Sequence, residues 1–251
     1  MLDSGARRAP DRQPILISFS GLDGAGKSTQ IEHLRSYLAA AGYRTTLLAF
    51  WDNVVVLSRY REGFVHKVYK SEIGVGAPDK PVQRRDKNVR KWYLTLTRHL
   101  LYFLDAVNLA MVLRATRCEN PDVIIMDRYI YDEWANLPLR SRFTHAYIQL
   151  LHALLPRPDI AYLLDADPDT AHARKPEYPV HFMHRCRAAY YRLAGLLGTM
   201  IIIPSLGLEQ AKQATEAVLR RMVHERELQP QVANASPSSV RATCARALPR
   251  T

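Results

Sequence analysis

Cysteine is scarce in this sequence. Only three of the 251 residues are cysteine, and no two of them form a C-x-x-C pair. This spacing argues against a cysteine-based metal or redox motif. An odd number of isolated cysteines, Cys118, Cys186 and Cys244, favours a protein of a reducing compartment.

The sequence also lacks an apolar segment of the kind that directs export or spans a membrane. Residues 1–14 contain no apolar core, so we do not expect a secretory signal. One long apolar stretch, 92–113, is interrupted by three polar or charged residues, Arg98, His99 and Asp105. Charges in the middle of a span are costly in lipid. We therefore expect a buried helix, no membrane partner and a cytoplasmic location.

The composition is that of a globular protein, with 47% hydrophobic and 24% charged residues. A net charge of +11 attracts polyphosphates, nucleic acids and anionic membranes alike, so charge does not choose among these partners. The chain ends are rich in arginine and lack periodicity. We expect one domain at 14–226, between a disordered segment 1–13 and a disordered basic tail 227–251.

Short apolar runs alternate with helical patterns along this domain. Strands are predicted at 15–20, 44–50, 122–126, 160–164 and 199–203. Helices are predicted at 28–41, 86–117, 143–154, 168–174, 180–197 and 208–226, with short helix and loop over 51–85. The alternation predicts an α/β fold of the P-loop NTPase type, a five-stranded parallel sheet with helices on both faces and a short lid.

The most specific motif is a phosphate-binding loop, which fits G-x-x-x-x-G-K-[ST] at every fixed position and joins a predicted strand to a predicted helix. Its glycines let backbone N–H groups turn toward one phosphate. Lys27 supplies a charge for the β and γ phosphates of ATP, and the Ser28 hydroxyl is a ligand for Mg²⁺. The predicted ATP-binding residues are Gly21, Leu22, Asp23, Gly24, Ala25, Gly26, Lys27, Ser28 and Thr29.

A second motif, Asp127-Arg128-Tyr129, follows the apolar strand 122–126. Residues just past the carboxyl ends of parallel strands line the ligand crevice. Asp127 is therefore expected to hold the metal, and Arg128 to clamp an acceptor phosphate. The alternative is a surface salt bridge between strands.

A third cluster, 173–179, is first basic and then bounded by prolines. It would serve as a lid that brings cations to the transferring phosphoryl group. The alternative is a solvated loop.

These motifs together resemble the thymidylate kinase family of nucleoside monophosphate kinases, over roughly residues 14–225. The resemblance implies transfer of the ATP γ-phosphoryl group to a nucleoside monophosphate, foremost dTMP, with Mg²⁺. It places Asp23 toward the acceptor, Arg128 and Tyr129 in the acceptor-binding motif, and Arg174 in the lid as the catalytic cation. Lys27, Arg174, Asp23 and Arg128 are the implied catalytic residues.

The acceptor side departs from the family pattern. Tyr102 takes the place of the aromatic residue under the base, but Ala106 stands where the family has an arginine that reads the base edge. Trp51 is a second candidate for stacking, and Arg98 is assigned to the same acceptor site. Glu133 falls where small polar residues are usual. The acceptor pocket is therefore expected to differ from that of the family.

Two other functions stay open at this point. A kinase of nucleosides or other small hydroxyl compounds would use Asp23 or Asp52 on the hydroxyl proton. A nucleotide-binding regulator or nucleic-acid partner would use the basic and aromatic run 84–98, whose spacing fits a helix face of the acceptor site better. We expect a small-molecule nucleotide substrate and no nucleic-acid partner, and leave a homodimer open.

Overall fold

The computed structural model describes residues 13–56 and 92–233. Two compact units divide the chain, 1–215 and 216–251, so the boundary falls inside the predicted domain 14–226. The last helix, α8 (Leu208–Ala233), crosses this boundary and ends at Ala233 rather than at 226. The predicted tail 227–251 therefore begins within a helix, and its remainder lies outside the described residues.

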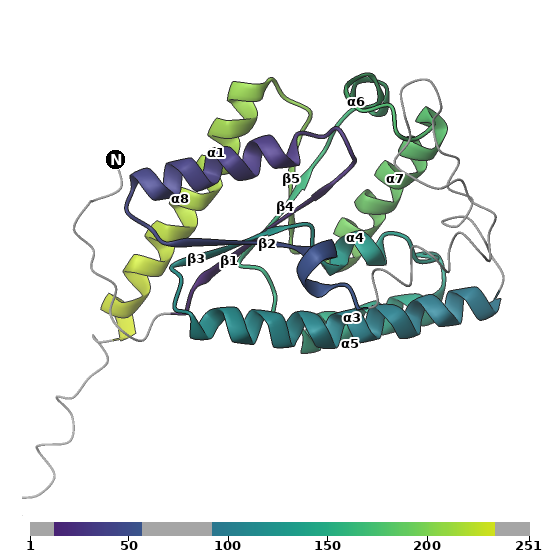
Figure 1. Ribbon diagram of the computed structural model, residues 1–251, viewed down its shortest axis with the longest axis horizontal. Coiled ribbons are helices and arrows are strands. Elements are labelled where there is room, and N and C mark those ends of the chain that lie inside the picture. Colours follow the sequence, from purple (N-terminus) through teal and green to yellow (C-terminus); the bar gives the residue numbers. More distant parts are fainter. Residues whose placement is uncertain (1–12, 57–91, 234–251) are drawn as a thin grey trace, which may run out of the picture. The chain divides into compact units, whose positions relative to one another are not determined.

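Five parallel strands form one sheet, in the order β2-β3-β1-β4-β5 (Figure 1). The strands are β1 (Ile15–Gly21), β2 (Thr45–Ala49), β3 (Val123–Asp127), β4 (Ile160–Leu164) and β5 (Met200–Ile203). The three central strands are nearly continuous apolar runs and are buried along almost their whole length. This is the pattern of a parallel sheet covered on both faces. The predicted sheet is confirmed.

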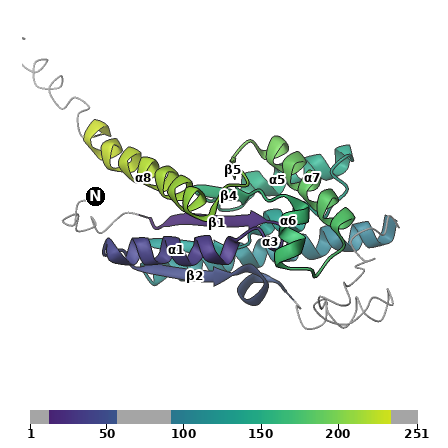
Figure 2. The same cartoon turned by 90° about the horizontal axis from the view of Figure 1, so that it is seen from above.

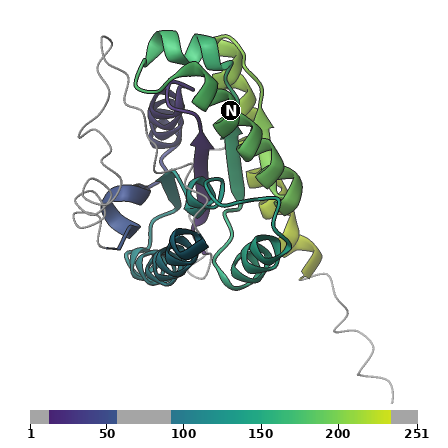
Figure 3. The same cartoon turned by 90° about the vertical axis from the view of Figure 1, so that its right-hand side faces the viewer.

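Helices cover both faces of the sheet. α1 (Lys27–Ala40) lies on one face, and α3 (Trp92–Cys118) and α5 (Arg142–Leu154) lie side by side on the other (Figures 1 and 3). α1 and α5 begin and end within one residue of the predicted bounds. The start predicted for α3, 86–91, lies outside the described residues.

Two short helices follow strands of the sheet; one was not predicted, and the other agrees with the short helix expected after 50. α4 (Ile130–Trp134) follows β3 where no helix was predicted, because five residues are too few to show a period. A single π-helical turn, η1 (Phe50–Val54), follows β2 and agrees with the short helix expected there. Both lie just past the carboxyl ends of strands, where ligand-binding residues gather.

The carboxyl ends of the strands point toward α6 (Pro168–Arg174) and α7 (Val180–Leu197), as Figure 2 shows. Both helices have exactly their predicted bounds. This end of the first unit holds the phosphate loop, the Asp127-Arg128-Tyr129 motif and the predicted lid.

Candidate functional site

Glycines let the phosphate loop come close to its neighbours. Gly24 has φ +83°, and a Cβ there would lie 2.5 Å from the carbonyl oxygen of Ala171 in α6. Gly21 has φ +141°, and its Cβ would lie 2.4 Å from the Leu164 oxygen at the end of β4. Gly26, with φ +87°, caps α1 and has open space around it. The loop therefore packs closely against β4 and α6, and it leads into the N-terminus of α1, a position that favours anions.

Lys27 is buried under this loop. Its Nζ donates hydrogen bonds to the carbonyl oxygens of Gly21 at 2.9 Å and Leu22 at 2.8 Å. It also lies 3.9 Å from a carboxylate oxygen of Asp23. Burial and the Arg128 charge lower the pKa of Lys27 to about 8, although nearby carboxylates oppose this shift. Binding of a polyphosphate at the loop would therefore change how far Lys27 is protonated.

The side chains expected to hold Mg²⁺ suit a metal that stays mostly on the nucleotide. Ser28 and Thr29 are exposed at the first turn of α1, and Asp127 is half-buried at the end of β3. No group of three His, Cys, Asp or Glu side chains that could hold a metal occurs among the described residues. Mg²⁺ commonly binds through one or two protein ligands plus phosphates and water. Ser28 and Asp127 fit such a site.

Arg128 links β3 to the phosphate loop. Its backbone has φ +67° and donates to the Phe19 oxygen at 3.0 Å. The guanidinium forms an ion pair with Asp23 and a second one with Asp132 at 3.2 Å. Burial lowers the pKa of Arg128, but these two carboxylates outweigh it and raise the pKa overall. Arg128 is a fixed, permanently charged group beside the loop.

Asp132 organises the groups around Arg128. Its carboxylate is buried and accepts hydrogen bonds from the Ser20 hydroxyl at 2.6 Å and the Tyr190 hydroxyl at 2.7 Å. Burial and the Asp132 charge raise the pKa of Tyr190 well above its usual value, so the phenol stays a donor. This role of Asp132 and Tyr190 was not predicted from the sequence. A carboxylate four residues after an arginine at a strand end was the one signal for Asp132.

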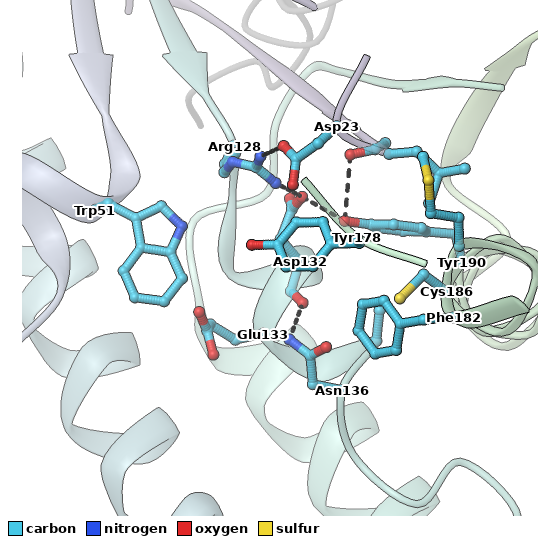
Figure 4. Close-up of a pocket in the computed structure, with 14 residues that line it drawn as sticks. Asp23, Trp51, Arg128, Asp132, Glu133, Asn136, Tyr178, Phe182, Cys186 and Tyr190 are labelled. Atoms are coloured by element: carbon cyan, nitrogen blue, oxygen red, sulfur yellow. Dashed lines mark hydrogen bonds and ion pairs between the residues drawn. The ribbon is translucent and has the colours of Figure 1, made fainter. Parts of the chain in front are cut away.

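These side chains line a small cavity of about 60 Å³. Asp23 and Arg128 lie together at one end, while Glu133 and Asn136 lie at the other (Figure 4). Aromatic rings form much of the wall. The lining residues are Gly21, Leu22, Asp23, Trp51, Arg128, Asp132, Glu133, Ala135, Asn136, Tyr178, Phe182, Met183, Cys186 and Tyr190.

The structure brings some predicted acceptor residues to this cavity and leaves others out. Trp51 and Arg128 are part of the lining. Tyr129 is not, because its ring packs in the core and its hydroxyl donates to the Pro156 carbonyl oxygen. Tyr102 is also a core residue, and Arg98 does not belong to the described lining. Tyr129, Tyr102 and Arg98 therefore do not line this cavity, and their assignment to the acceptor site stays a prediction.

The predicted lid is a short connection between α6 and α7. Lys175 and Glu177 form an ion pair at 2.9 Å, and the His172 ring is hydrogen-bonded to the Tyr178 oxygen at 2.8 Å. Arg174 is exposed at the end of α6, one helical turn beyond the Ala171 carbonyl that faces the phosphate loop. The connection thus carries cations close to the loop and an aromatic ring, Tyr178, into the cavity wall.

Chemically, the site is suited to phosphoryl transfer. Gly21, Leu22 and Asp23 of the phosphate-binding loop line the cavity, and Asp23 forms an ion pair with Arg128, which lines it as well. Transfer of a phosphoryl group relies on positioning and on charge stabilisation more than on covalent chemistry by the protein. Loop amides, Lys27 and Arg128 supply both.

Comparisons with known proteins agree with this chemistry. No family model matches the chain. It is 28% identical to the thymidylate kinase of Bifidobacterium longum subsp. infantis over 225 residues, which cover 84% of this chain and 88% of the relative. A probable thymidylate kinase of Sulfolobus acidocaldarius is 29% identical over 163 residues, 64% of this chain and 68% of the relative.

A solved structure shares the fold. The thymidylate kinase from Ehrlichia chaffeensis superposes with a TM-score of 0.53 at 17% identity, covering 83% of this chain and all of the other. The P-loop NTPase fold predicted from the sequence is therefore confirmed. The thymidylate kinase of B. longum strain DJO10A is 30% identical over 165 residues, 64% of this chain and 70% of the relative. At that identity and coverage, this chain belongs to the thymidylate kinase family.

Proposed function

We propose that this protein transfers the γ-phosphoryl group of ATP to the phosphate of a nucleoside monophosphate, with dTMP as the leading acceptor. The observation that carries the proposal is the Asp23–Arg128 ion pair, which joins the phosphate loop to the cavity. An acceptor phosphate at Arg128 would lie beside a donor phosphate on the loop. The relatives named thymidylate kinase support the same reaction.

On this proposal, the chain contributes positioning and charge. The loop amides and Lys27 bind the donor phosphates, and Arg128 binds the acceptor phosphate. Arg174 at the end of α6 stabilises the charge that develops on the transferring group. Mg²⁺, held by Ser28 and Asp127, would neutralise charge on the β and γ phosphates.

The acceptor ring has aromatic partners in the cavity. Trp51 is 44% exposed at the mouth, and Figure 4 shows Phe182 across the cavity from it. Tyr178 and Phe182 are neighbours, with ring centroids 5.6 Å apart. A planar base between Trp51 on one side and Phe182 on the other would be stacked and partly shielded from water.

The proposal is tested by incubating the purified protein with ATP, Mg²⁺ and each of a panel of nucleosides and nucleoside monophosphates. ADP formation and labelled product are measured for each acceptor. We expect dTMP to be converted to dTDP. Labelling of unphosphorylated acceptors alone would show that the protein is a nucleoside kinase instead.

We infer that the protein works as a homodimer in the cytoplasm. Exposed apolar side chains follow one face of α3 at helical spacing, namely Leu96, Leu100, Phe103, Leu104, Val107 and Met111. Thr95–Cys118 is long and apolar enough to cross a membrane, and only 33% of that window is buried in protein, so the expectation of a buried helix here is wrong. A second copy of the chain is our proposed cover for this face.

A further inference from the structure

The wall of the cavity at Trp51 is built by the π-helical turn η1, which packs against α3 (Figure 1). Phe50 and Val54, at the two ends of this turn, are fully buried. Trp51 between them is 44% exposed and lines the cavity. The two ends of the turn are therefore anchored in the core, while its second residue presents an aromatic ring to the cavity.

Two polar side chains of α3 hold the segment that follows Trp51. The Asp105 carboxylate accepts a hydrogen bond from the backbone N–H of Val56 at 2.8 Å, and the Asn108 amide nitrogen donates to the carbonyl oxygen of Val54 at 2.6 Å. Asp105 and Asn108 are three residues apart, so they are neighbours on the surface of α3. Both bonds reach backbone groups, so they fix the course of the chain itself.

Asp105 stands where packing alone favours an apolar residue. It is fully buried, and Tyr102, Ala106 and Leu109, which neighbour it on α3, belong to the hydrophobic core. A buried charge costs stability unless it is hydrogen-bonded, and an apolar side chain of similar size often stabilises a core more. The packing of α3 therefore does not account for Asp105, whereas its hydrogen bond to the segment after Trp51 does.

We propose that Asp105 and Asn108 are positioning residues of the acceptor site, which hold Trp51 where it stacks on the base of the acceptor. This inference rests on the proposed function and assigns α3 a part in building the site. Neither side chain belongs to the described lining of the cavity, so both act through the turn. Without these bonds the turn can shift, and a displaced ring loses its contact with the base while the phosphate loop is unaffected.

The test separates binding of the acceptor from binding of the donor. KM is measured for dTMP at saturating ATP and for ATP at saturating dTMP. We expect Asn108→Ala and Asp105→Ala each to raise KM for dTMP by about five- to tenfold, and to change KM for ATP by less than about twofold. Asp105→Asn keeps an oxygen that can accept the Val56 N–H, so it should restore most of the affinity for dTMP.

Thr97→Ala is the matched control on the same helix. The Thr97 hydroxyl donates to the Tyr93 carbonyl oxygen at 2.9 Å, so this substitution removes a side-chain hydrogen bond that stays within α3. It should leave KM for dTMP and KM for ATP unchanged.

A double-mutant cycle tests whether the effect passes through Trp51. Trp51→Ala removes the ring and should itself raise KM for dTMP by about tenfold. Adding Asn108→Ala to Trp51→Ala should then change KM for dTMP by less than about twofold, because the two substitutions act on the same contact. A merely structural role of Asn108 would instead give independent effects that multiply.

Partial unfolding of a variant lowers kcat but leaves the KM of the folded fraction unchanged, so the two constants distinguish a folding defect from a positioning effect. Asn108→Ala, at a half-buried position, decides the matter if Asp105→Ala does not fold. An unchanged KM for dTMP, equal rises in KM for dTMP and ATP, or independent effects in the cycle would overturn this proposal and leave the proposed function standing. An unmodified protein that phosphorylates no monophosphate would overturn the proposed function and this inference with it.

Discussion

Lys27 combines burial, two backbone contacts and a lowered pKa in one side chain. Replacing it by alanine removes the charge that would bind the β and γ phosphates. We expect Lys27→Ala to lower kcat/KM by about 10²–10³, the loss typical of one preorganised donor. Arg35→Ala removes an exposed cation from the same helix and should change activity little. Unchanged activity in Lys27→Ala would sink the phosphate-loop assignment.

The pKa of Lys27, about 8, also predicts how ATP binding depends on pH. Only the protonated amine of Lys27 binds phosphates well, and a bound polyanion raises the pKa of Lys27 again. Above pH 8, where the free protein has mostly lost this proton, ATP binding is therefore accompanied by uptake of a proton. Affinity for ATP should fall by about tenfold between pH 7 and pH 9. Calorimetry in buffers of different ionisation enthalpy measures both the affinity and the proton uptake.

Lys27→Arg is the matched control for this pH dependence, because a guanidinium stays charged over the whole range. Whatever its absolute affinity, its binding should vary less with pH than that of the unmodified protein. An ATP affinity of the unmodified protein that stays flat from pH 7 to pH 9 would contradict a lowered pKa at Lys27.

At the scale of elements, the phosphate loop and α6 meet at a glycine. Gly24→Ala combines a left-handed backbone with a Cβ 2.5 Å from the Ala171 oxygen, so α6 would have to move. Gly26→Ala meets the same kind of backbone strain but open space. We expect Gly26→Ala to lower the free energy of unfolding by about 1–2 kcal/mol, and Gly24→Ala by more. Urea unfolding of both variants measures these free energies. Equal decreases for the two variants would mean that the loop does not pack tightly against α6.

Tyr190 couples α7 to α4 through its hydrogen bond to Asp132. Tyr190→Phe removes a buried hydrogen bond to a charged group, which contributes about 1.5–3 kcal/mol to stability. It should also lower kcat/KM, because Asp132 helps to hold Arg128. Tyr191→Phe is the control: it removes a hydroxyl contact with Asp165 at a 41% exposed position of the same helix, outside the cavity, so it should cost less stability than Tyr190→Phe and leave activity unchanged. Stability that falls without any loss of activity would confine Asp132 to a structural role.

The elements were easier to predict than the side chains of the site. Buried parallel strands are continuous apolar runs, and the loop motif requires a strand before it and a helix after it, so the sheet and the donor site follow from local patterns. Tyr129 shows the limit: the left-handed backbone at Arg128 turns the next side chain into the core, and no local pattern announces that turn. The hydrogen bond between Tyr190 and Asp132 joins residues far apart in the sequence, so no local pattern predicts it either.

At the scale of the whole molecule, the apolar face of α3 is the feature that calls for a partner. Leu96, Leu100 and Met111 are each at least 57% exposed, and α5 alongside adds Phe143 and Leu150 at 64% and 59%. Soluble monomers rarely expose apolar patches beyond a few hundred Å². A stable interface buries about 800 Å² on each partner, a size that two neighbouring helices can supply.

Leu100→Glu places a charge in the middle of this face and should convert a dimer to a monomer in analytical ultracentrifugation. Ala39→Glu adds the same charge at an exposed position of α1, on the opposite face of the sheet, and should leave the dimer intact. Because the cavity is lined by other elements, the monomer should keep its nucleotide binding. An unmodified protein that sediments as a monomer would rule out the second copy, and its cosedimentation with lipid vesicles would assign the α3 face to a membrane surface instead.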